Sequence, residues 1–431
     1  MNISKDQMKL FPEDSKIVNK LPFFYGWVIV FVSGIILFCS APGQTYVNSV
    51  FLEPMLNELD WSRTTYSATY TMGSLTAAVM MIIVGRVLDK FGYRLILSIL
   101  CILMGLSTLW MSNVDSIYKL FIAFALLRTI GQGSFQLVST NLVSTWFIKR
   151  RGFATGISSL GQGASMFVFP LLAHLLIQNF GWRSSWQILG IIVLGILLPL
   201  AIFFVKDSPE KVGLLPDGVQ KNETDLNEEI TNEINFTFGE AIVTKTFWFL
   251  VFSVIATPLI ITGLHFHHVS ILATKGLGSG LAAFTMSLFG PTALISNFFC
   301  GYLADKIPNR FLMACGQISL ILTMLWLVTI SETWQAVIYV SMASLSMSLV
   351  HTSYTVIWAN YYGRKHLGSI RGFSSSATVG FSALGALPFG IIYDRTQSYD
   401  QALYYLILIP IFCCICSLMA TRPSKRLVIE K

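Results

Sequence analysis

The sequence predicts an all-α membrane protein whose twelve transmembrane helices form two six-helix bundles, with both termini in the cytoplasm. The first observation behind this prediction is composition. Of the 431 residues, 54% are hydrophobic and only 12% are charged, which is roughly half the charged share of a soluble globular domain. A soluble protein of this size would need more ionic surface. The second observation is a series of apolar segments of about 20 residues, the length that crosses a bilayer as a helix. The third is an internal repeat.

Twelve apolar segments follow one another along the chain. We expect spans near residues 24–50, 64–85, 95–112, 117–146, 153–179, 184–205, 246–272, 281–304, 311–330, 334–361, 369–393 and 401–420. A long polar stretch with Pro/Gly turns and an acidic tract divides them six plus six and predicts a flexible tether. The expected parts of the chain are an N-terminal tail (1–23), an N-terminal bundle (24–205), a cytoplasmic linker (206–245), a C-terminal bundle (246–420) and a C-terminal tail (421–431).

Basic residues are distributed unevenly between the two sides of this arrangement. With twelve spans, 23 of the 29 Lys and Arg residues fall on the side that carries both termini, and five fall on the other. Because cytoplasmic loops are enriched in these residues, we expect a multi-pass protein of the plasma (inner) membrane. The net charge of +7 lies in short clusters between apolar segments. It does not form the basic, aromatic-rich surface that a nucleic-acid partner would require.

An internal repeat relates the two halves of the chain. GRVLDKFGYR at 85–94 matches GYLADKIPNR at 301–310 with an offset of 216, and the tripeptide at 151–153 recurs at 371–373 with an offset of 220. The first match pairs Gly85 with Gly301, Asp89 with Asp305, and Arg94 with Arg310. Such a repeat predicts duplicated bundles with a substrate site at their interface, near the middle of the bilayer.

Several motifs in order resemble the major facilitator superfamily of transporters. GRVLDKFGYR resembles the signature between helices two and three, and LLRTIGQGSFQ at 126–136 resembles the helix-four motif. The monocarboxylate and oxalate/formate transporter-like branch is suggested by similar stretches at 24–30, 146–165, 213–218 and 363–373. The resemblance covers about residues 25–420. Members of this branch commonly carry an arginine in helix eight, and Asn297 stands at that place here.

The resemblance also implies a role for the repeated charged motifs. It implies that Asp89 caps a helix of the opposite bundle and pairs with a nearby base, with a gain of about 0.3–2 kcal/mol from the helix dipole. We therefore expect a conformational role for the repeat residues, and the alternative is a charge cluster that only sets topology. The gating residues are Gly85, Asp89, Arg94, Gly301, Asp305 and Arg310.

One arginine falls near mid-depth in the predicted spans. Arg128 is followed at i+4 steps by Gln132, Gln136 and Thr140, which would place four polar groups on one helix face. Charges inside a bilayer are functional candidates by default, so we expect Arg128 to bind substrate or to couple transport. The alternative is a buried arginine that only orders the bundle. We expect Gln132, Gln44 and Asn48 to solvate its guanidinium.

Two further helices carry polar stripes. In helix one, Ser40, Gln44 and Asn48 repeat at i+4 beside Pro42 and Gly43, with Tyr46 nearby. Breaks in membrane helices are tolerated where they line a cavity, so we expect these residues to line the substrate path. In helix ten, the aromatic stripe of His351, Tyr354 and Trp358 fits a binding wall and interface packing equally well.

Histidines form a cluster toward the outer end of helix seven. His265 and His268 lie one turn apart, and a proton-sensing or substrate contact is one interpretation. Solvation at the membrane interface is the other. No Cys or carboxylate nearby completes a metal site, so we expect no metal and no cofactor.

Together these features predict a secondary active transporter of a small solute, and the sequence suggests an organic anion such as a monocarboxylate. The alternatives are an exporter of amphiphilic compounds in the same superfamily and a membrane receptor that senses a solute without transporting it. No G-x-x-x-x-G-K-[ST] phosphate loop and no catalytic constellation occur, so we expect neither ATP drive nor enzymatic activity. The expected partners are the lipid bilayer, the substrate and a coupling ion or counter-solute, with the protein monomeric.

The base asymmetry makes a topology prediction. In a variant without native cysteines, a cysteine at Ser279 should react with an impermeant thiol reagent added outside intact cells, whereas a cysteine at Asn222 should react only after the cells are opened. The cysteine-free variant is the control for background labelling. Labelling in the reverse order would show that the predicted orientation is wrong.

Overall fold

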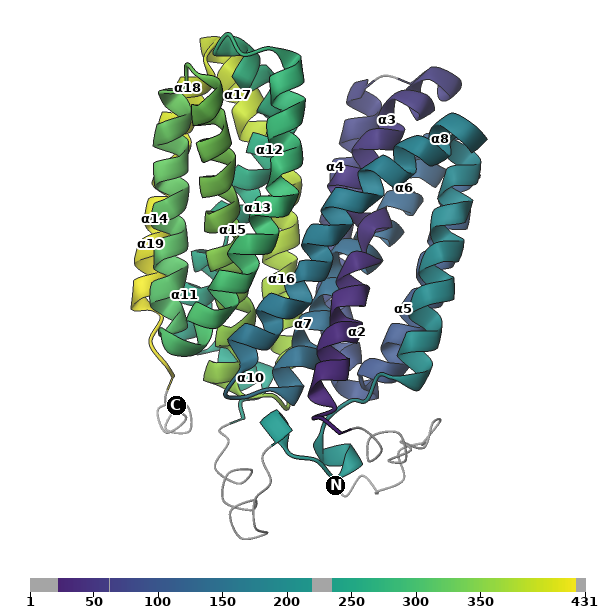
Figure 1. Cartoon of the computed structure of the whole chain (residues 1–431), viewed down its shortest axis with the longest axis vertical. Helices are drawn as coiled ribbons and strands as arrows, with labels where there is room; N and C mark the ends of the chain where they lie inside the picture. The colour runs from purple at the N-terminus through teal and green to yellow at the C-terminus, as the bar shows by residue number, and fades with distance from the viewer. Residues whose placement is uncertain (1–21, 62, 219–234, 424–431) are drawn as a thin grey trace.

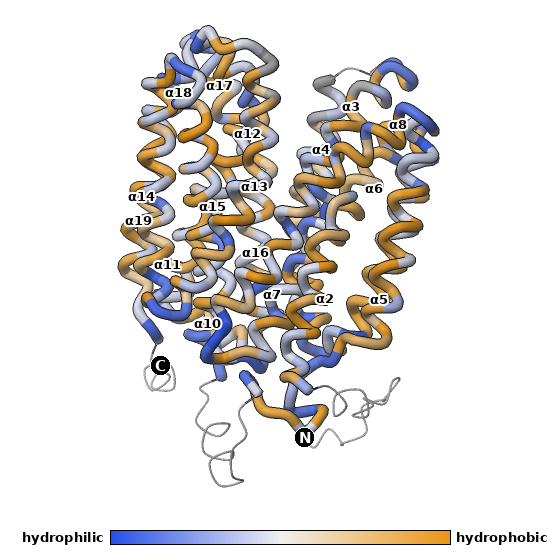
Figure 2. The backbone as a smooth tube through the Cα atoms, viewed as in Figure 1, coloured by the Kyte–Doolittle hydropathy of each residue, from blue (hydrophilic) through white to orange (hydrophobic). Residues whose placement is uncertain are grey.

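The computed structural model describes residues 22–61, 63–218 and 235–423, and the regular secondary structure assigned to these residues is all helical. Nine of the helices in this part of the chain are long and apolar enough to cross a membrane. Figure 1 shows two groups of helices, which we name the N-terminal group (22–218) and the C-terminal group (235–423). The groups come together at the end where α10 lies, the proximal end, and diverge toward the opposite, distal end, where α17 and α18 lie. Orange, hydrophobic stretches run along the outer helices of both groups (Figure 2).

The first predicted span is broken into separate pieces, and the fourth contains a π-helical turn. The N-terminal group consists of α2 (Gly26–Phe38), η1 (Ala41–Gly43), α3 (Thr45–Leu59), α4 (Arg63–Phe91), α5 (Tyr93–Ser112), α6 (Ile117–Leu127), the π-helix η2 (Arg128–Ser134), α7 (Phe135–Trp146) and α8 (Arg151–Phe203), followed by the short turns η3 (Glu210–Val212) and η4 (Pro216–Gly218).

The C-terminal group begins with a short helix whose start is fixed by a pair of hydrogen bonds. The Thr237 side chain accepts from the backbone N–H of Glu240, whose carboxylate accepts from the backbone N–H of Thr237, and such a capping box fixes the start of a helix. The group consists of α10 (Phe238–Ile242), α11 (Lys245–Ser253), α12 (Ala256–Thr274), α13 (Ser279–Lys306), α14 (Asn309–Val328), α15 (Thr333–Tyr362), α16 (Leu367–Leu384), α17 (Ala386–Thr396), α18 (Tyr399–Leu406) and α19 (Leu408–Met419).

Helix α8 contains two of the predicted spans, which a sharp bend separates. Gly181 has φ +74° inside α8, a conformation that residues with a Cβ rarely adopt. Just beyond it, Arg183 donates from Nε to Glu58 Oε1 at 2.9 Å and Trp182 donates from Nε1 to Glu58 Oε2 at 2.6 Å. The hydrogen bond from Arg183 holds the pKa of the Glu58 carboxyl below its usual range. These contacts attach the distal turn to the end of α3.

Within the N-terminal group, α2 and α8 touch through glycines. A Cβ at Gly161 would lie 1.9 Å from the backbone oxygen of Gly34, whereas a Cβ at Gly195, further along α8, would meet nothing within 4 Å. Helices in a bilayer gain little from the hydrophobic effect and associate through close packing of small residues. The α2–α8 contact therefore depends on the absence of a side chain at Gly161.

These two α8 glycines make a matched pair for a stability test. We expect Gly161→Ala to lower the apparent thermal unfolding midpoint in detergent, because overpacking of this kind costs about 1–3 kcal/mol. Gly195→Ala should leave the midpoint unchanged or raise it, since alanine is favoured over glycine in a helix by up to about 1 kcal/mol. Equal midpoints for the two variants would contradict the close contact between α2 and α8.

Candidate functional site

The break in helix one lies directly against the π-helical turn of helix four. A Cβ at Gly43 would lie 2.2 Å from the Leu127 carbonyl oxygen and 2.7 Å from the Cα of Gly131. Pro42 lies inside η1 and has no N–H to donate, so the helical hydrogen-bond pattern is interrupted there. π-Helical turns are uncommon and occur frequently at functional sites. The two irregular segments together bring the Gly43 carbonyl oxygen close to the side chain of Arg128.

Arg128 is held by neutral groups alone. Its side chain is only 1% exposed, and Nε donates to Ser74 Oγ at 3.0 Å. Nη1 donates to the Gly43 carbonyl oxygen at 3.0 Å and to Thr45 Oγ1 at 3.3 Å. The guanidinium also lies 4.9 Å from the centre of the Tyr70 ring, within the range of a cation–π interaction. Among the ion pairs of the described residues, none involves Arg128.

The partners predicted for Arg128 are wrong. Gln44 donates from Nε2 to Ser40 Oγ at 3.2 Å. Asn48 donates from Nδ2 to the Gln44 and Pro42 carbonyl oxygens at 2.8 and 3.2 Å, so these amides satisfy groups of the broken helix itself. The i+4 argument for Gln132 assumed a regular α-helix, and the π-helix over Arg128–Ser134 changes the register. Gln132 keeps a buried Oε1 without a partner.

Tyr46 connects helix one to α8 beside this centre. Its hydroxyl lies 2.8 Å from Ser165 Oγ and accepts from Gln162 Nε2 at 3.1 Å. The Ser165 hydroxyl in turn donates to the Phe38 carbonyl oxygen at 2.7 Å, at the end of α2. The predicted polar face of helix one is therefore divided: part of it seals the helix break and Tyr46 contacts α8.

Two of the predicted residues meet across the two groups. Gln136 Nε2 on α7 lies 2.6 Å from His351 Nε2 on α15, a contact between the N-terminal and C-terminal groups. Tyr354, one turn along α15, is 7% exposed and donates its hydroxyl hydrogen to Ser374 Oγ on α16. Trp358 is fully buried against aromatic rings. The helix-ten stripe thus combines an inter-group polar contact with packing.

The repeated aspartates each cap a helix of the other group. Asp89 on α4 accepts from the backbone N–H groups of Gly368 and Ser369 at 2.7 and 2.6 Å. Asp305 on α13 accepts from those of Gly152 and Phe153 at 2.5 and 2.8 Å. The capping that the resemblance implied is confirmed for Asp89 and recurs for Asp305. We name these two contacts the reciprocal clasp.

The two clasp contacts are related by a single sequence offset. The capped residues 152 and 153 correspond to 368 and 369 with the offset of 216 that also relates the two aspartates. The offset of 220, taken from the repeated tripeptide, is therefore wrong as a structural equivalence by about one helical turn. As a consequence, Arg371 lies a turn deeper in α16 than Arg151 lies in α8.

Glycines let the clasped helices approach. A Cβ at Gly85 would lie 2.2 Å from the Gly368 carbonyl oxygen, and a Cβ at Gly301 would lie 2.8 Å from that of Gly152. The helices can reach the distance at which a carboxylate bonds two backbone N–H groups only if both positions lack side chains. Gly85 and Gly301 thus belong to the same inter-group contacts as Asp89 and Asp305.

The repeated arginines do not share one arrangement. Arg94 donates from Nε to the Ile202 carbonyl oxygen at 2.9 Å, and its backbone N–H donates to Asp207 at 3.0 Å, so it holds elements of its own group together. The guanidinium of Arg310 lies 4.7 Å from the ring centre of the neighbouring Phe311. A common gating role for both arginines is not evident from these contacts.

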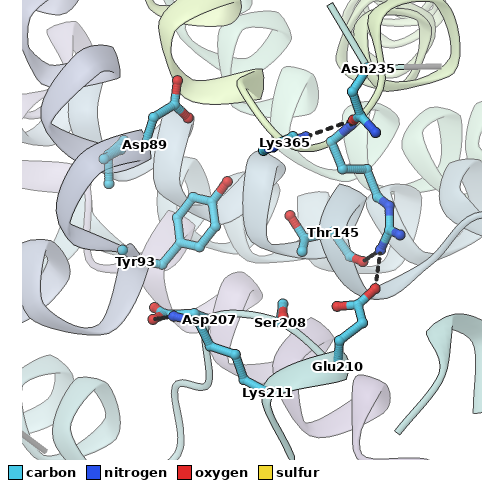
Figure 3. Close-up of a pocket in the computed structure, with 12 residues that line it drawn as sticks. Asp89, Tyr93, Thr145, Asp207, Ser208, Glu210, Lys211, Asn235 and Lys365 are labelled. Atoms are coloured by element: carbon cyan, nitrogen blue, oxygen red, sulfur yellow. Dashed lines mark hydrogen bonds and ion pairs between the residues drawn. The ribbon is translucent and has the colours of Figure 1, made fainter. Parts of the chain in front are cut away.

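A cavity of about 350 Å³ opens beside the clasp at the proximal end. Arg364 crosses it, donating to the Thr145 carbonyl oxygen at 2.7 Å and pairing with Glu210 at 3.0 Å, while Lys211 pairs with Asp207 at 2.7 Å. Figure 3 shows Asp207, Glu210 and Lys211 around the cavity with Asp89 and Tyr93. Because these pairs are already formed, we interpret the cavity as part of the proximal closure.

Sequence reasoning missed two arginine–asparagine contacts between the groups. Arg371 is 2% exposed and donates from Nη1 to Asn141 Oδ1 at 2.7 Å. Arg151, also 2% exposed, donates from Nη1 to Asn360 Oδ1. The signal was present in the repeated tripeptide, but Arg371 lies near the predicted start of helix eleven, where the sequence alone does not separate a buried arginine from a loop charge.

The histidines of helix seven do not form a solvated interfacial cluster. His268 is 2% exposed, and its Nε2 lies 3.0 Å from Thr285 Oγ1 and 3.2 Å from the Ala282 carbonyl oxygen. The ring of His265 packs edge-on against Phe289 at 4.4 Å between centroids. Interfacial solvation is therefore wrong for His268. Among the described residues, no group of three potential ligands could hold a metal ion.

The clasp yields a prediction about the proximal end. We expect Asp89→Asn to populate a longer distance between spin labels placed at Lys149→Cys and Lys365→Cys, exposed positions in the two groups, in a variant without native cysteines. The amide keeps one acceptor oxygen but turns its NH₂ toward a backbone N–H. Pulsed electron–electron double resonance measures the distances between the two labels. Asp115→Asn, at the distal end, should leave them unchanged, and an unaltered distribution in Asp89→Asn would show that the clasp does not hold the groups together.

Sequence comparison places this chain among known proteins. The model of the Major Facilitator Superfamily matches residues 33–386. The probable sulfoacetate transporter SauU of Cupriavidus necator is 24% identical over 75% of this chain and 77% of its own length. The oxalate:formate antiporter of Oxalobacter formigenes is 24% identical over 64% and 63%, and monocarboxylate transporter 9 of Mus musculus is 28% identical over 48% and 42%. The chain thus spans less than two thirds of the length of the last two relatives.

Two solved structures share the fold. The transporter FucP in its outward conformation superposes with a TM-score of 0.67 and 14% identity, covering 92% of this chain and all of that chain. The human organic anion transporter MFSD10 superposes with a TM-score of 0.70 and 12% identity, covering 91% of this chain and 99% of that chain. The family match covers most of the chain, and the paired helix groups have the same overall arrangement as these structures. This chain therefore belongs to the Major Facilitator Superfamily, and the part that the structure describes has the helical, multi-pass membrane fold of that family.

Proposed function

We propose that this protein is a secondary active transporter that moves a small organic anion, such as a monocarboxylate, across the plasma membrane by alternating access. In this proposal the chain crosses the bilayer twelve times as two six-helix bundles, residues 24–205 and 246–420, with cytoplasmic termini. The proximal end is then the cytoplasmic end. A coupling ion or a counter-solute supplies the driving force.

The neutral surroundings of Arg128 carry this proposal. A guanidinium keeps its proton under biological conditions, and a charge at the centre of a membrane helix costs about 2.5–3.5 kcal/mol on insertion scales. Ser74, Thr45 and the Gly43 carbonyl solvate the charge without neutralising it. An anionic substrate would supply the missing negative charge, and a carboxylate fits the planar guanidinium through two parallel hydrogen bonds.

Arg128 is also placed where a solute could reach its neighbours. Its own side chain is buried, but Thr45, which bonds it, is exposed, and the Thr45 hydroxyl lies 2.8 Å from that of Tyr70. Tyr46, the next residue, is half-buried. In the proposed mechanism these hydroxyls orient the substrate while Arg128 attracts it, and Gln136, His351 and Tyr354 provide contacts where the two groups meet.

The names of the relatives support the same substrate class. Sulfoacetate, oxalate, formate and monocarboxylates are all small organic anions. These are properties of those proteins, each of which differs from this chain at about three quarters of the aligned positions. They favour a small carboxylate over the larger amphiphilic compounds that the sequence left as an alternative.

The inter-group contacts support alternating access. The reciprocal clasp, the arginine–asparagine contacts and Arg364 all join the groups near the proximal end, and the groups diverge distally (Figure 1). This arrangement fits a conformation that is closed on the cytoplasmic side. Transport would then require these contacts to separate while others form at the distal end.

Substitution of Arg128 tests the proposed substrate class. We expect Arg128→Gln to weaken carboxylate binding at this centre by about tenfold or more, because hydrogen bonds to charged groups contribute about 1.5–3 kcal/mol. Arg128→Lys should also weaken binding, since an ammonium cannot reproduce a planar bidentate contact. The measurement is the rise in thermal unfolding temperature of purified protein with formate, acetate, lactate or oxalate.

The neutral analogue acetamide is the ligand control for this experiment. Both variants should remain folded, because removing a charge that lacks an ionic partner need not destabilise the protein. If Arg128→Gln responds to carboxylates with the affinity of the parent, Arg128 has only a structural role. If the parent responds to no carboxylate, the proposed substrate class is wrong.

A further inference from the structure

The C-terminal group also contains a buried guanidinium, that of Arg371. Arg371 is in the second turn of α16, just beyond the residues that Asp89 caps. Its side chain is 2% exposed, and its Nη1 donates to Asn141 of α7. Among the described residues, none of the ion pairs includes Arg371. The C-terminal group therefore also contributes a buried arginine that none of these ion pairs neutralises.

The Arg371–Asn141 contact contains donors in excess. Arg371 Nε and Asn141 Nδ2 are both buried without a hydrogen-bond partner in the described structure, although Asn141 Oδ1 accepts from Arg371. A buried donor without an acceptor costs about 1–3 kcal/mol, and more if it is charged. The site therefore offers two unsatisfied N–H donors beside one positive charge. A ligand that fits this chemistry is an anion with at least two acceptor oxygens.

Arg151 provides the internal comparison. It makes the equivalent kind of contact with Asn360 of the opposite group, but its Nε also donates to the Ser144 and Phe147 carbonyl oxygens at 3.2 and 2.9 Å. Its guanidinium is thus satisfied by the end of α7 and has a structural role. The two arginines are alike in burial and differ in the supply of acceptors.

The surroundings of Arg371 suit an anion that crosses between the groups. The guanidinium lies 5.9 Å from the Tyr354 ring centre, and His351 is close enough to interact with it electrostatically. The contact of His351 with Gln136, five residues before Asn141 on α7, also joins the groups. These side chains form a polar strip between the Arg128 centre and the proximal clasp.

We infer that Arg371 and Asn141 form a second anion-binding site, at which a carboxylate entering from the proximal side displaces Asn141 from Arg371 and thereby loosens the closed contact. This inference rests on the proposed function and adds a binding residue from the C-terminal group. Asn141 holds the guanidinium while the site is empty. A carboxylate provides two acceptors and a full negative charge, so it binds the guanidinium more strongly than a neutral amide does.

The inference predicts that carboxylates open the proximal end through Arg371. In the cysteine-free variant with spin labels at Lys149→Cys and Lys365→Cys, oxalate or lactate in chloride-free buffer should increase the population at longer distances. Acetamide should not. The carboxylate response should be lost in Arg371→Gln, which keeps a polar side chain but has no charge.

Asn141→Asp tests the same site in the opposite direction. A fixed carboxylate would neutralise Arg371 permanently, so the labels should stay at the short distance and should not respond to added carboxylate. Asn360→Asp introduces the same change beside Arg151 and is the matched control, which should keep the response. If either Arg371→Gln or Asn141→Asp still opens with carboxylate as the parent does, the inference is overturned.

A separate readout distinguishes this inference from the proposed function. Carboxylate binding is measured independently by thermal shift on the same proteins. A parent that binds carboxylates but shows no change in label distance overturns the role of Arg371 and leaves the proposed function standing. A parent that neither binds nor opens with any carboxylate overturns both.

Discussion

The closed proximal end depends on two carboxylates that each bond the backbone at the start of a helix in the other group. The first N–H groups of a helix have no partner within it, and the helix dipole favours a negative charge there. Asp89 and Asp305 meet both conditions because Gly85 and Gly301 let the helix backbones approach. The two contacts are related by one offset in sequence, so the groups are held symmetrically on either side of the polar strip. The contacts of Arg151, Arg371 and Arg364 join the same two groups near this end.

A second constraint is the interrupted helix one. A regular helix would use the Gly43 carbonyl within its own hydrogen-bond pattern, whereas the break at Pro42 turns this oxygen toward Arg128. Gln44 and Asn48 then satisfy groups that the break exposes. The result is a buried arginine solvated by dipoles. A salt bridge to a fixed carboxylate would remove the positive field, whereas neutral partners preserve it for a ligand.

The sequence was sufficient for an all-helical membrane fold, because composition reports directly on lipid exposure, and the family resemblance implied the helix cap at Asp89. It was insufficient where local geometry departs from the ideal helix. The i+4 spacing after Arg128 predicted a common face, but a π-helical turn changed the register of Gln132. The repeated tripeptide at Arg151 and Arg371 suggested equivalence, yet the glycine spacing that sets helix contact places them a turn apart. The burial of His268 depends on partners from α13, which a helix-seven pattern cannot reveal.

The chemistry of the inter-group contacts is suited to a closure that must be reversible. A ligand can shift a conformational equilibrium only by its difference in affinity for the two states, and a few kcal/mol is a large shift. A buried salt bridge between the groups could cost about 3–5 kcal/mol to break from one side, which a small anion could hardly offset. Apart from the Arg364–Glu210 ion pair, whose carboxylate is partly exposed, the contacts described here are instead carboxylate to backbone N–H, and guanidinium to amide. Each is individually modest, and the amide at Asn141 is a weaker partner for Arg371 than a carboxylate would be. A small anion that replaces the Asn141 amide binds Arg371 more strongly than the amide does. The difference in binding free energy is then available to separate the two groups.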